Sequence, residues 1–372
     1  MDALIQKEIK SAFAVIVDGR MEIFVKAKYY DPLFYISSDK MPFTIRIEVE
    51  LEEKILEKSL RCAVDTAMPR YPYFAVRIVK KDGEYLEEHN DKPVPTYFGA
   101  DAKALGKEET NGHLLALSYF ENKIFFYVSH IITDGGGFFP FIKTVLYYYL
   151  CDRYQTVLDP DGINLKDDPF FDDETGNPFD ENKMKNAAPF CQKKLPEYFR
   201  LKSGGYVCDH KSTVFRLSLS EEEVMRFNYD NDGSPCALLS SLMAKAIQNV
   251  HPDEKKDIVS AVSFNLRPGL GNRHSYRMLC SAIMLDYPDK TRGTDITKMC
   301  TCSRGMTMLQ SQPENVIFYA ASRKKRVEKL LALPDIEEKK RILGDDPSLI
   351  TLTQHEKFIM ELDHIAKRIG IE

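Results

Sequence analysis

The sequence predicts an α/β protein built of two lobes, and three observations support this fold class. The chain has 372 residues, more than one ordinary hydrophobic core accommodates. Strand-like and helix-like patterns occur on both sides of residues 155–195, a stretch that has no periodicity. In the first half, a strongly apolar strand leads through the letters HIITDGGG into an amphipathic helix. We therefore expect an N-terminal lobe at 1–170, a crossover linker at 171–209 and a C-terminal lobe at 210–372.

The elements of the first lobe follow from their hydrophobic periods. Residues 43–51 alternate apolar and polar and predict a strand, and apolar residues at helical spacing over 55–67 predict a helix ended by Pro69 and Pro72. Residues 73–89 predict two strands joined by a Lys-Asp-Gly turn, and residues 113–130 predict a hairpin whose second strand is buried on both faces. One face of a following helix carries Phe138, Phe141, Ile142, Val145 and Tyr149.

The second lobe is expected to begin with a strand at 210–220. Ser220 with Glu223 forms a capping box for the next helix, and Ser234 followed by Pro235 begins another. An apolar strand over 258–268 ends in Asn265 and Arg267, and residues 293–312 and 318–334 predict helices.

Composition and charge exclude several classes of function. The net charge is −5 without a dense basic run, so we expect no nucleic-acid partner. No apolar run approaches the roughly 20 residues that span a bilayer. The eight cysteines are scattered without a CxxC pair, which favours reduced thiols and a cytoplasmic location. Nothing in the sequence indicates an oligomeric state.

His130 and Asp134 stand out because two ionisable residues lie between very apolar stretches. A histidine at a strand end is most often a hydrogen-bonded structural residue, and Asp-Gly-Gly is ordinary turn chemistry. A metal site is disfavoured because no second histidine lies nearby and because the glycines should break a helix there. The chain has no GxSxG for a hydrolase nucleophile, and no Lys-Ser/Thr follows the glycines as a phosphate loop requires.

The letters HIITDGG resemble the HxxxDG motif of the chloramphenicol acetyltransferase-like superfamily. That group contains condensation domains of peptide synthetases, plant acyl-CoA-dependent acyltransferases and alcohol acetyltransferases. RYPYFAVRI at 70–78, DGSPCALLSSLMAKAI at 232–247 and SFNLRP at 263–268 resemble further segments of the same group. The similarity covers roughly residues 40–310 and looks closest to bacterial alcohol acetyltransferase-like proteins.

The resemblance implies two lobes, each a mixed sheet with flanking helices, and a tunnel in which an acyl thioester meets an alcohol or amine. His130 would be the general base, since a neutral imidazole with an ordinary pKa of about 6.5 can take the acceptor's proton. Direct attack needs no acyl-enzyme. Acyl-CoA or an acyl carrier would be the co-substrate, and we expect no tightly bound cofactor and no metal. The alternative is a catalytically silent relative that uses the cleft for binding.

The resemblance also implies roles for the residues around His130. Asp134 would pair with Arg267, and Gly135 would let the backbone turn where a β-carbon would clash. Gly136 and Gly137 would either let substrate approach or serve only as turn residues. Asn265 and Tyr276 would either line the tunnel and contact substrate or serve only in strand-end packing. His113 and His274 are expected at structural or surface positions, and Phe138, Phe139 and Phe141 in the helix core and not in an acyl pocket.

Three departures from the group's pattern qualify these expectations. Ser129 stands where condensation domains usually carry a first histidine, which favours stand-alone acyltransferases. The plant-type DFGWG segment is absent, as it must be in a chain without tryptophan. The chain is also shorter than most members of the group, so we expect a second lobe that is reduced or incomplete.

Overall fold

The computed structural model describes residues 12–17, 20–26, 35, 37, 43–81, 84–179, 181–185, 197–199, 217–344 and 365–371. The chain divides into two compact units, each assembled from separate segments. The first comprises Met1–Asp180, Gly271–Leu279 and Ser322–Asp345, and the second comprises Glu181–Leu270, Cys280–Ala321 and Asp346–Glu372. The return of 271–279 and 322–345 to the first unit was not indicated by any sequence pattern. The sequence-based boundaries at 170 and 209 stay a prediction.

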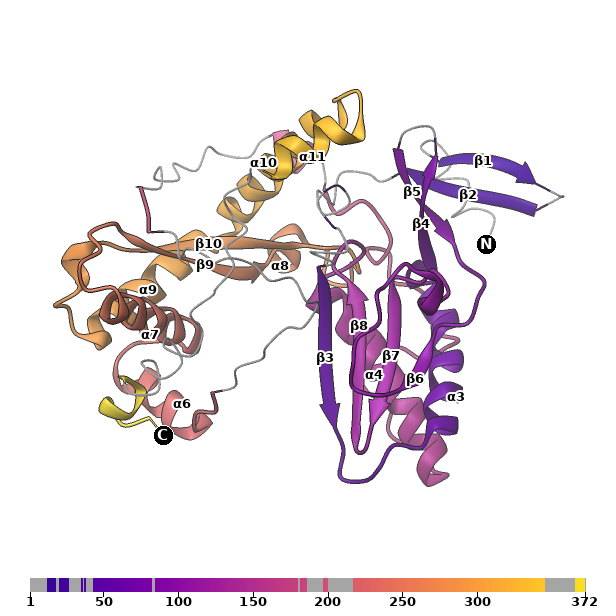
Figure 1. The fold of residues 1–372 in the computed structure, drawn as a ribbon, viewed down its shortest axis with the longest axis horizontal. Helices are drawn as coiled ribbons and strands as arrows, with labels where there is room; N and C mark the ends of the chain where they lie inside the picture. The colour runs from indigo at the N-terminus through magenta and orange to yellow at the C-terminus, as the bar shows by residue number, and fades with distance from the viewer. Residues whose placement is uncertain are drawn as a thin grey trace. The chain divides into compact units, whose positions relative to one another are not determined.

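The first unit contains a four-stranded mixed sheet that carries the HxxxDG motif (Figure 1). Its order is β3 (Thr44–Glu50), β8 (Lys123–Ser129), β7 (Leu115–Phe120) and β6 (Thr96–Phe98). Neighbouring strands are antiparallel except for β6 and β7, which are parallel. The predicted strand at 43–51 and the predicted hairpin are confirmed. Strand β8 is central and buried along almost its whole length, as its apolar sequence predicted.

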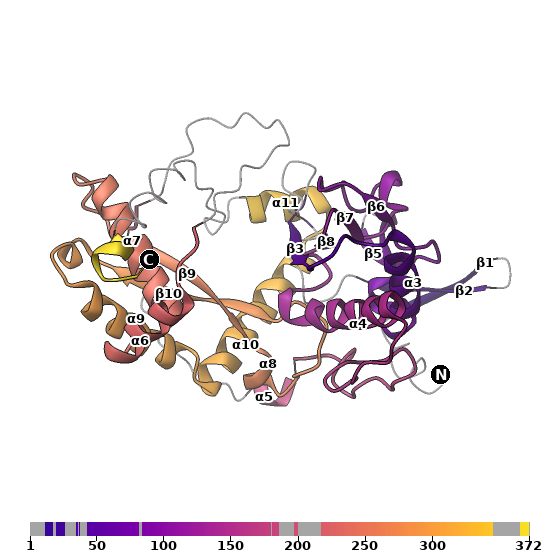
Figure 2. The same ribbon diagram turned by 90° about the horizontal axis from the view of Figure 1, so that it is seen from below.

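One face of this sheet is covered by two helices that pack against each other, α3 (Glu57–Ala67) and α4 (Gly135–Tyr154) (Figures 1 and 2). Alternate residues of β3, β7 and β8 meet the apolar faces of both helices in a single core. The helix face predicted from Phe138 to Tyr149 is confirmed, because Phe138, Phe141, Ile142, Val145 and Tyr149 are all buried in that core. Phe139 was expected there too, but 52% of it is exposed, so that expectation is wrong.

A second sheet of the first unit has the order β1 (Ala12–Val17), β2 (Arg20–Lys26), β5 (Glu84–His89) and β4 (Val76–Lys81), all antiparallel. The two strands predicted over 73–89 are confirmed, while their Asp-Gly turn lies outside the described residues. Strands β1 and β2 were not predicted. Short 3-10 helices at Met68–Arg70, Pro72–Phe74 and Glu108–Thr110 complete the connections.

In the described part of the second unit, helices surround an antiparallel pair, β9 (Ile258–Asn265) and β10 (Cys280–Tyr287). The helices are α5 (Glu181–Lys185), α6 (Glu221–Asp230), α7 (Pro235–Val250), α8 (Arg267–Leu270) and α9 (Ile296–Gln310), with a 3-10 turn at Asp289–Thr291. Helix α10 (Pro313–Leu331) runs from the second unit into the first, and α11 (Ile336–Gly344) lies in the first. Helix α7 packs on α9 and on the strand pair.

The helix starts of this unit confirm Ser220 and Ser234 as N-caps, while the return bond from the Glu223 side chain that would complete the capping box stays a prediction. The Ser220 hydroxyl accepts a hydrogen bond from Glu223 N at 3.3 Å, and the Ser234 hydroxyl accepts one from Ala237 N at 3.3 Å. The strand predicted over 258–268 is present but ends at Asn265, because the chain turns into α8 at Arg267. The helices over 293–312 and 318–334 are present, although α10 starts earlier than expected, at Pro313. Most of the strand predicted at 210–220 lies outside the described residues. No helix among the described residues is long and apolar enough to cross a membrane.

Candidate active site

The backbone of His130 is fixed by the two strands that flank β8. Ser129 N donates to Leu114 O at 2.8 Å, and His130 N donates to Phe43 O at 2.7 Å. The histidine therefore sits where the ladder ends, with its chain held from both sides, and its side chain is half-buried. This placement agrees with the sequence interpretation of a residue delivered by the far end of a hairpin.

The imidazole of His130 is held in one tautomer. Its Nδ1 lies 2.8 Å from the carbonyl oxygen of Thr133. A carbonyl can only accept a hydrogen bond, so Nδ1 carries the proton and donates it. In the neutral ring Nε2 then has the free lone pair, which is the arrangement that a general base requires.

Asp134 ends the motif turn, which we define as residues 130–134, and begins helix α4. Its Oδ1 accepts from Gly137 N at 2.9 Å, which makes it the N-cap, and its Oδ2 accepts from Leu279 N at 2.8 Å. The carboxylate is 4% exposed and lies at the positive end of the helix dipole. Asp134 thus joins the motif turn to a segment 145 residues further along the chain. Its predicted pairing with Arg267 stays a prediction.

The three glycines form the first turn of α4 and do not precede it. A β-carbon at Gly135 would meet only the Phe139 ring, at 3.9 Å, so the expected clash at Gly135 is wrong. The crowded position is Gly137, where a β-carbon would lie 2.1 Å from the carbonyl oxygen of Tyr276 and 2.5 Å from the Thr133 hydroxyl. Gly136 is exposed, whereas Gly137 is buried. A side chain at position 137 could therefore be admitted only if the backbone at Tyr276 and the Thr133 side chain moved.

Tyr276 lies beside the motif turn, and its ring belongs to the core of the first unit. It is 6% exposed and stacks on Tyr73, with ring centroids 4.0 Å apart and planes 12° apart. Its carbonyl oxygen accepts a hydrogen bond from the Thr133 hydroxyl at 2.6 Å. Of the two roles weighed for Tyr276, packing is the one that these contacts describe.

A buried ion pair lies behind Tyr276, and sequence reasoning missed it. Arg70 donates from both terminal nitrogens to Glu174, at 2.7 and 2.8 Å, and the Tyr73 hydroxyl donates to the same carboxylate at 2.6 Å. Arg70 and Glu174 are 1% and 2% exposed. Burial is the largest single influence and opposes the charge on Arg70, but hydrogen bonding to Glu174 and the attraction of its negative charge together raise the arginine pKa. Burial and the Glu174 carboxylate together raise the pKa of Tyr73. The backbone carbonyl of Glu174 accepts from Tyr276 N at 3.2 Å.

The second unit carries the other two sequence-predicted residues. Asn265, at the end of β9, is exposed, and its Oδ1 accepts from the backbone N of Arg267 at 3.0 Å and from Arg267 Nη1 at 3.2 Å. Arg267 begins α8 and is 3% exposed. The Asn265 amide, at the strand end in SFNLRP, thus orients the buried guanidinium of Arg267.

The remaining histidines singled out in the sequence have structural partners outside the motif turn. His113 is fully buried, its Nε2 lies 2.7 Å from Lys92 O, and burial lowers its pKa. His274 Nδ1 lies 2.8 Å from Asp173 Oδ1, and its ring stacks on Phe171. Within the described ranges, no group of three or more His, Cys, Asp or Glu residues could hold a metal ion.

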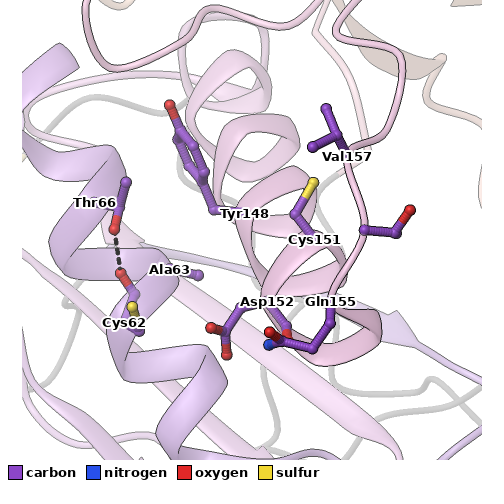
Figure 3. Close-up of a pocket in the computed structure, with 9 residues that line it drawn as sticks. Cys62, Ala63, Thr66, Tyr148, Cys151, Asp152, Gln155 and Val157 are labelled. Atoms are coloured by element: carbon purple, nitrogen blue, oxygen red, sulfur yellow. Dashed lines mark hydrogen bonds between the residues drawn. The ribbon is translucent and has the colours of Figure 1, made fainter.

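A groove of about 650 Å³ lies between α3 and the end of α4 (Figure 3). Its lining comes from both helices and from the chain that leaves α4. The lining residues are Cys62, Ala63, Thr66, Tyr148, Cys151, Asp152, Gln155, Thr156 and Val157. None of the sequence-predicted site residues lines it, so the groove is distinct from the motif turn.

Comparison with solved structures shows that the chain shares its fold with condensation domains and related proteins. The condensation domain of the monacolin K polyketide synthase MokA has a TM-score of 0.52 and 11% identity over 82% of this chain and 76% of that one. The polyketide synthase associated protein 5 of Mycobacterium tuberculosis has a TM-score of 0.51 and 11% identity over 76% and 74%. TRI101 of F. graminearum, in complex with coenzyme A and deoxynivalenol, has a TM-score of 0.50 and 11% identity over 90% and 81%. No family model and no curated protein matches the chain.

Proposed function

We propose that the chain is an acyltransferase that moves an acyl group from a thioester to an alcohol or amine, with His130 as the general base. The observation that carries this proposal is the hydrogen bond from His130 Nδ1 to Thr133 O at 2.8 Å, which leaves Nε2 basic. The shared fold with condensation domains and with TRI101 supports acyl transfer as the class of reaction. The low identities to these proteins mean that the fold supports no particular substrate.

The reaction follows from the chemistry of the imidazole. Nε2 takes the proton of the acceptor hydroxyl or amine as its oxygen or nitrogen attacks the thioester carbonyl carbon. The tetrahedral intermediate collapses with cleavage of the C–S bond, and the thiolate leaves with the proton that the imidazolium returns. The product is an ester or amide with a free thiol, and His130 regains its starting tautomer.

Coenzyme A is the thioester carrier that we propose first, because a fold neighbour, TRI101, was solved with coenzyme A bound. An acyl carrier protein is the alternative donor, since condensation domains share the fold. The predicted pairing of Arg267 with Asp134 would add to the two backbone hydrogen bonds that already hold this carboxylate. The scattered cysteines favour a cytoplasmic location for this activity.

The proposal is tested by incubating the purified chain with acetyl-CoA and longer acyl-CoAs against a panel of alcohols and amines. Free thiol is measured by a colour reagent and the acylated acceptor by mass spectrometry. We expect thiol release and acylated acceptor in equal amounts. Thiol release with free acid alone would mean hydrolysis, and binding of coenzyme A without turnover would favour a catalytically silent relative.

A further inference from the structure

We propose that Thr133 is a positioning residue for His130, acting through a clasp between its hydroxyl and the carbonyl oxygen of Tyr276. The inference rests on the proposed function, because it concerns the orientation of the proposed base. Thr133 contributes at both of its ends: its carbonyl oxygen accepts the Nδ1 proton of His130 at 2.8 Å, and its hydroxyl donates to Tyr276 O at 2.6 Å. The hydrogen bond to Tyr276 therefore links Thr133, whose carbonyl orients the His130 imidazole, to the segment 271–279.

The clasp is enclosed by protein. Thr133 is fully buried, and its β-branched side chain has few rotamers. Its hydroxyl also lies 3.1 Å from the carbonyl oxygen of Asp134, but the contact of 2.6 Å with Tyr276 O is the shorter one. Gly137 closes the space from the helix side, since a β-carbon there would overlap both the Thr133 hydroxyl and the Tyr276 carbonyl oxygen. The absence of a side chain at position 137 is therefore what lets the hydroxyl and the carbonyl meet.

The carbonyl that receives the Thr133 hydroxyl is itself fixed from three directions. The Tyr276 ring stacks on Tyr73 at 4.0 Å, and Tyr276 N donates to the carbonyl of Glu174 at 3.2 Å. Three residues further on, Leu279 N donates to Asp134 at 2.8 Å. Since Glu174 is held by its buried pair with Arg70, the clasp connects His130, through the backbone of Tyr276, to this ion pair.

Loss of the clasp should loosen the Thr133 carbonyl and let the imidazole proton distribute between the two nitrogens. Thr133→Val removes the hydroxyl with almost no change of shape, and Thr133→Ser keeps the hydroxyl. A matched control is Thr144→Val, in helix α4. Thr144 is also fully buried, and its hydroxyl lies 2.9 Å from the carbonyl of Asn164, 3.1 Å from that of Pro140 and 2.7 Å from the Tyr71 hydroxyl. These hydrogen-bond partners all lie outside the motif turn.

The tautomer of His130 can be read directly by NMR of the whole chain with ¹⁵N-labelled histidine, with His130→Ala used to assign the signal. We expect the wild type, Thr133→Ser and Thr144→Val to show an unprotonated Nε2. Thr133→Val should show shifts of both ring nitrogens toward a mixture. A folded Thr133→Val protein with the wild-type tautomer would overturn the proposal. Thr133→Ala, which adds no methyl to the site, provides the same comparison should the valine variant not fold.

Steady-state kinetics provide a second test, because a purely structural role for Thr133 would not lower kcat while leaving KM unchanged. We expect Thr133→Val to lower kcat by about three- to tenfold with an unchanged KM, because the clasp acts on the base and not on substrate binding. Thr133→Ser should restore kcat, and Thr144→Val should leave it unchanged. Equal losses in the Thr133→Val and Thr144→Val variants would contradict a positioning role. A tautomer change in a chain without acyl transfer would instead refute the proposed function and leave the clasp standing.

Discussion

Gly137→Ala should destabilise the first unit, because the structure leaves no room for a β-carbon at this position. The added β-carbon would lie 2.1 Å from the Tyr276 carbonyl oxygen and 2.5 Å from the Thr133 hydroxyl, and backbone must shift to admit it. Overpacking of this kind costs about 1–3 kcal/mol, and loss of the hydrogen bond between Thr133 and Tyr276 adds about 1 kcal/mol. Alanine favours a helix over glycine by up to about 1 kcal/mol. We therefore expect Gly137→Ala to destabilise the first unit by about 1–3 kcal/mol.

Gly135→Ala, two residues earlier in the same helical turn, is the matched control. Its β-carbon would meet only the Phe139 ring at 3.9 Å, so the helix preference of alanine acts alone and the change should be neutral or stabilising by up to about 1 kcal/mol. Hydrogen exchange by mass spectrometry, followed on peptides from α4, measures both opening free energies. Equal protection of α4 in the two variants would refute the reasoning, because the two alanines are predicted to act with opposite sign.

Three further predictions concern the polar groups that support the site. Asp134→Asn should cost about 1.5–3 kcal/mol in the free energy of unfolding, because Gly137 N and Leu279 N bond to different carboxylate oxygens and the amide replaces one of these with an NH2 donor. Glu174→Gln should cost about 3–5 kcal/mol, because it leaves the buried Arg70 guanidinium without its counter-charge. Stability should fall as the pH drops below about 6.5, because burial lowers the pKa of His113 and the unfolded chain then binds the proton more readily.

Urea unfolding followed by circular dichroism measures the free energies of unfolding of the Asp134→Asn and Glu174→Gln variants. Asp295→Asn, at the exposed N-cap of α9, is the control for Asp134, and equal losses at both caps would contradict the special role of the buried carboxylate. An unchanged midpoint for Glu174→Gln would mean that the pair with Arg70 carries no stability. The loss of unfolding free energy between pH 7 and pH 5 should be smaller in His113→Gln than in the wild type. An identical dependence of stability on pH would show that His113 is not the group responsible.

The strand–turn–helix unit around His130 could be predicted because its information is local. The apolar run of β8 and the helical spacing from Phe138 to Tyr149 each lie within one element, and both are confirmed. The glycines were expected to break a helix but form its first turn, since the Asp134 N-cap bond to Gly137 N stabilises a helical turn that their propensity opposes. The position at which a β-carbon would clash is Gly137 and not Gly135. This could not be predicted, because the clash at Gly137 is with Tyr276, which is distant in the sequence.

The contacts that hold the motif turn could not be predicted, because they join residues far apart in the chain. Arg70 and Glu174 are separated by 104 positions, and Thr133 and Tyr276 by 143. Single residues of these types have no periodicity, and the stretch containing Glu174 resembled a linker in composition. The pairing of Asp134 with Arg267 came from resemblance alone and stays a prediction.

The central claim, that His130 Nε2 is the base for acyl transfer, is tested most directly by the turnover of His130→Ala against that of His274→Ala. Both variants remove one imidazole, but His274 is bonded to Asp173, outside the motif turn. General base catalysis contributes about 10²–10⁴-fold, so kcat should fall by that factor in His130→Ala and remain at the wild-type value in His274→Ala. Full turnover by a folded His130→Ala protein would contradict the account.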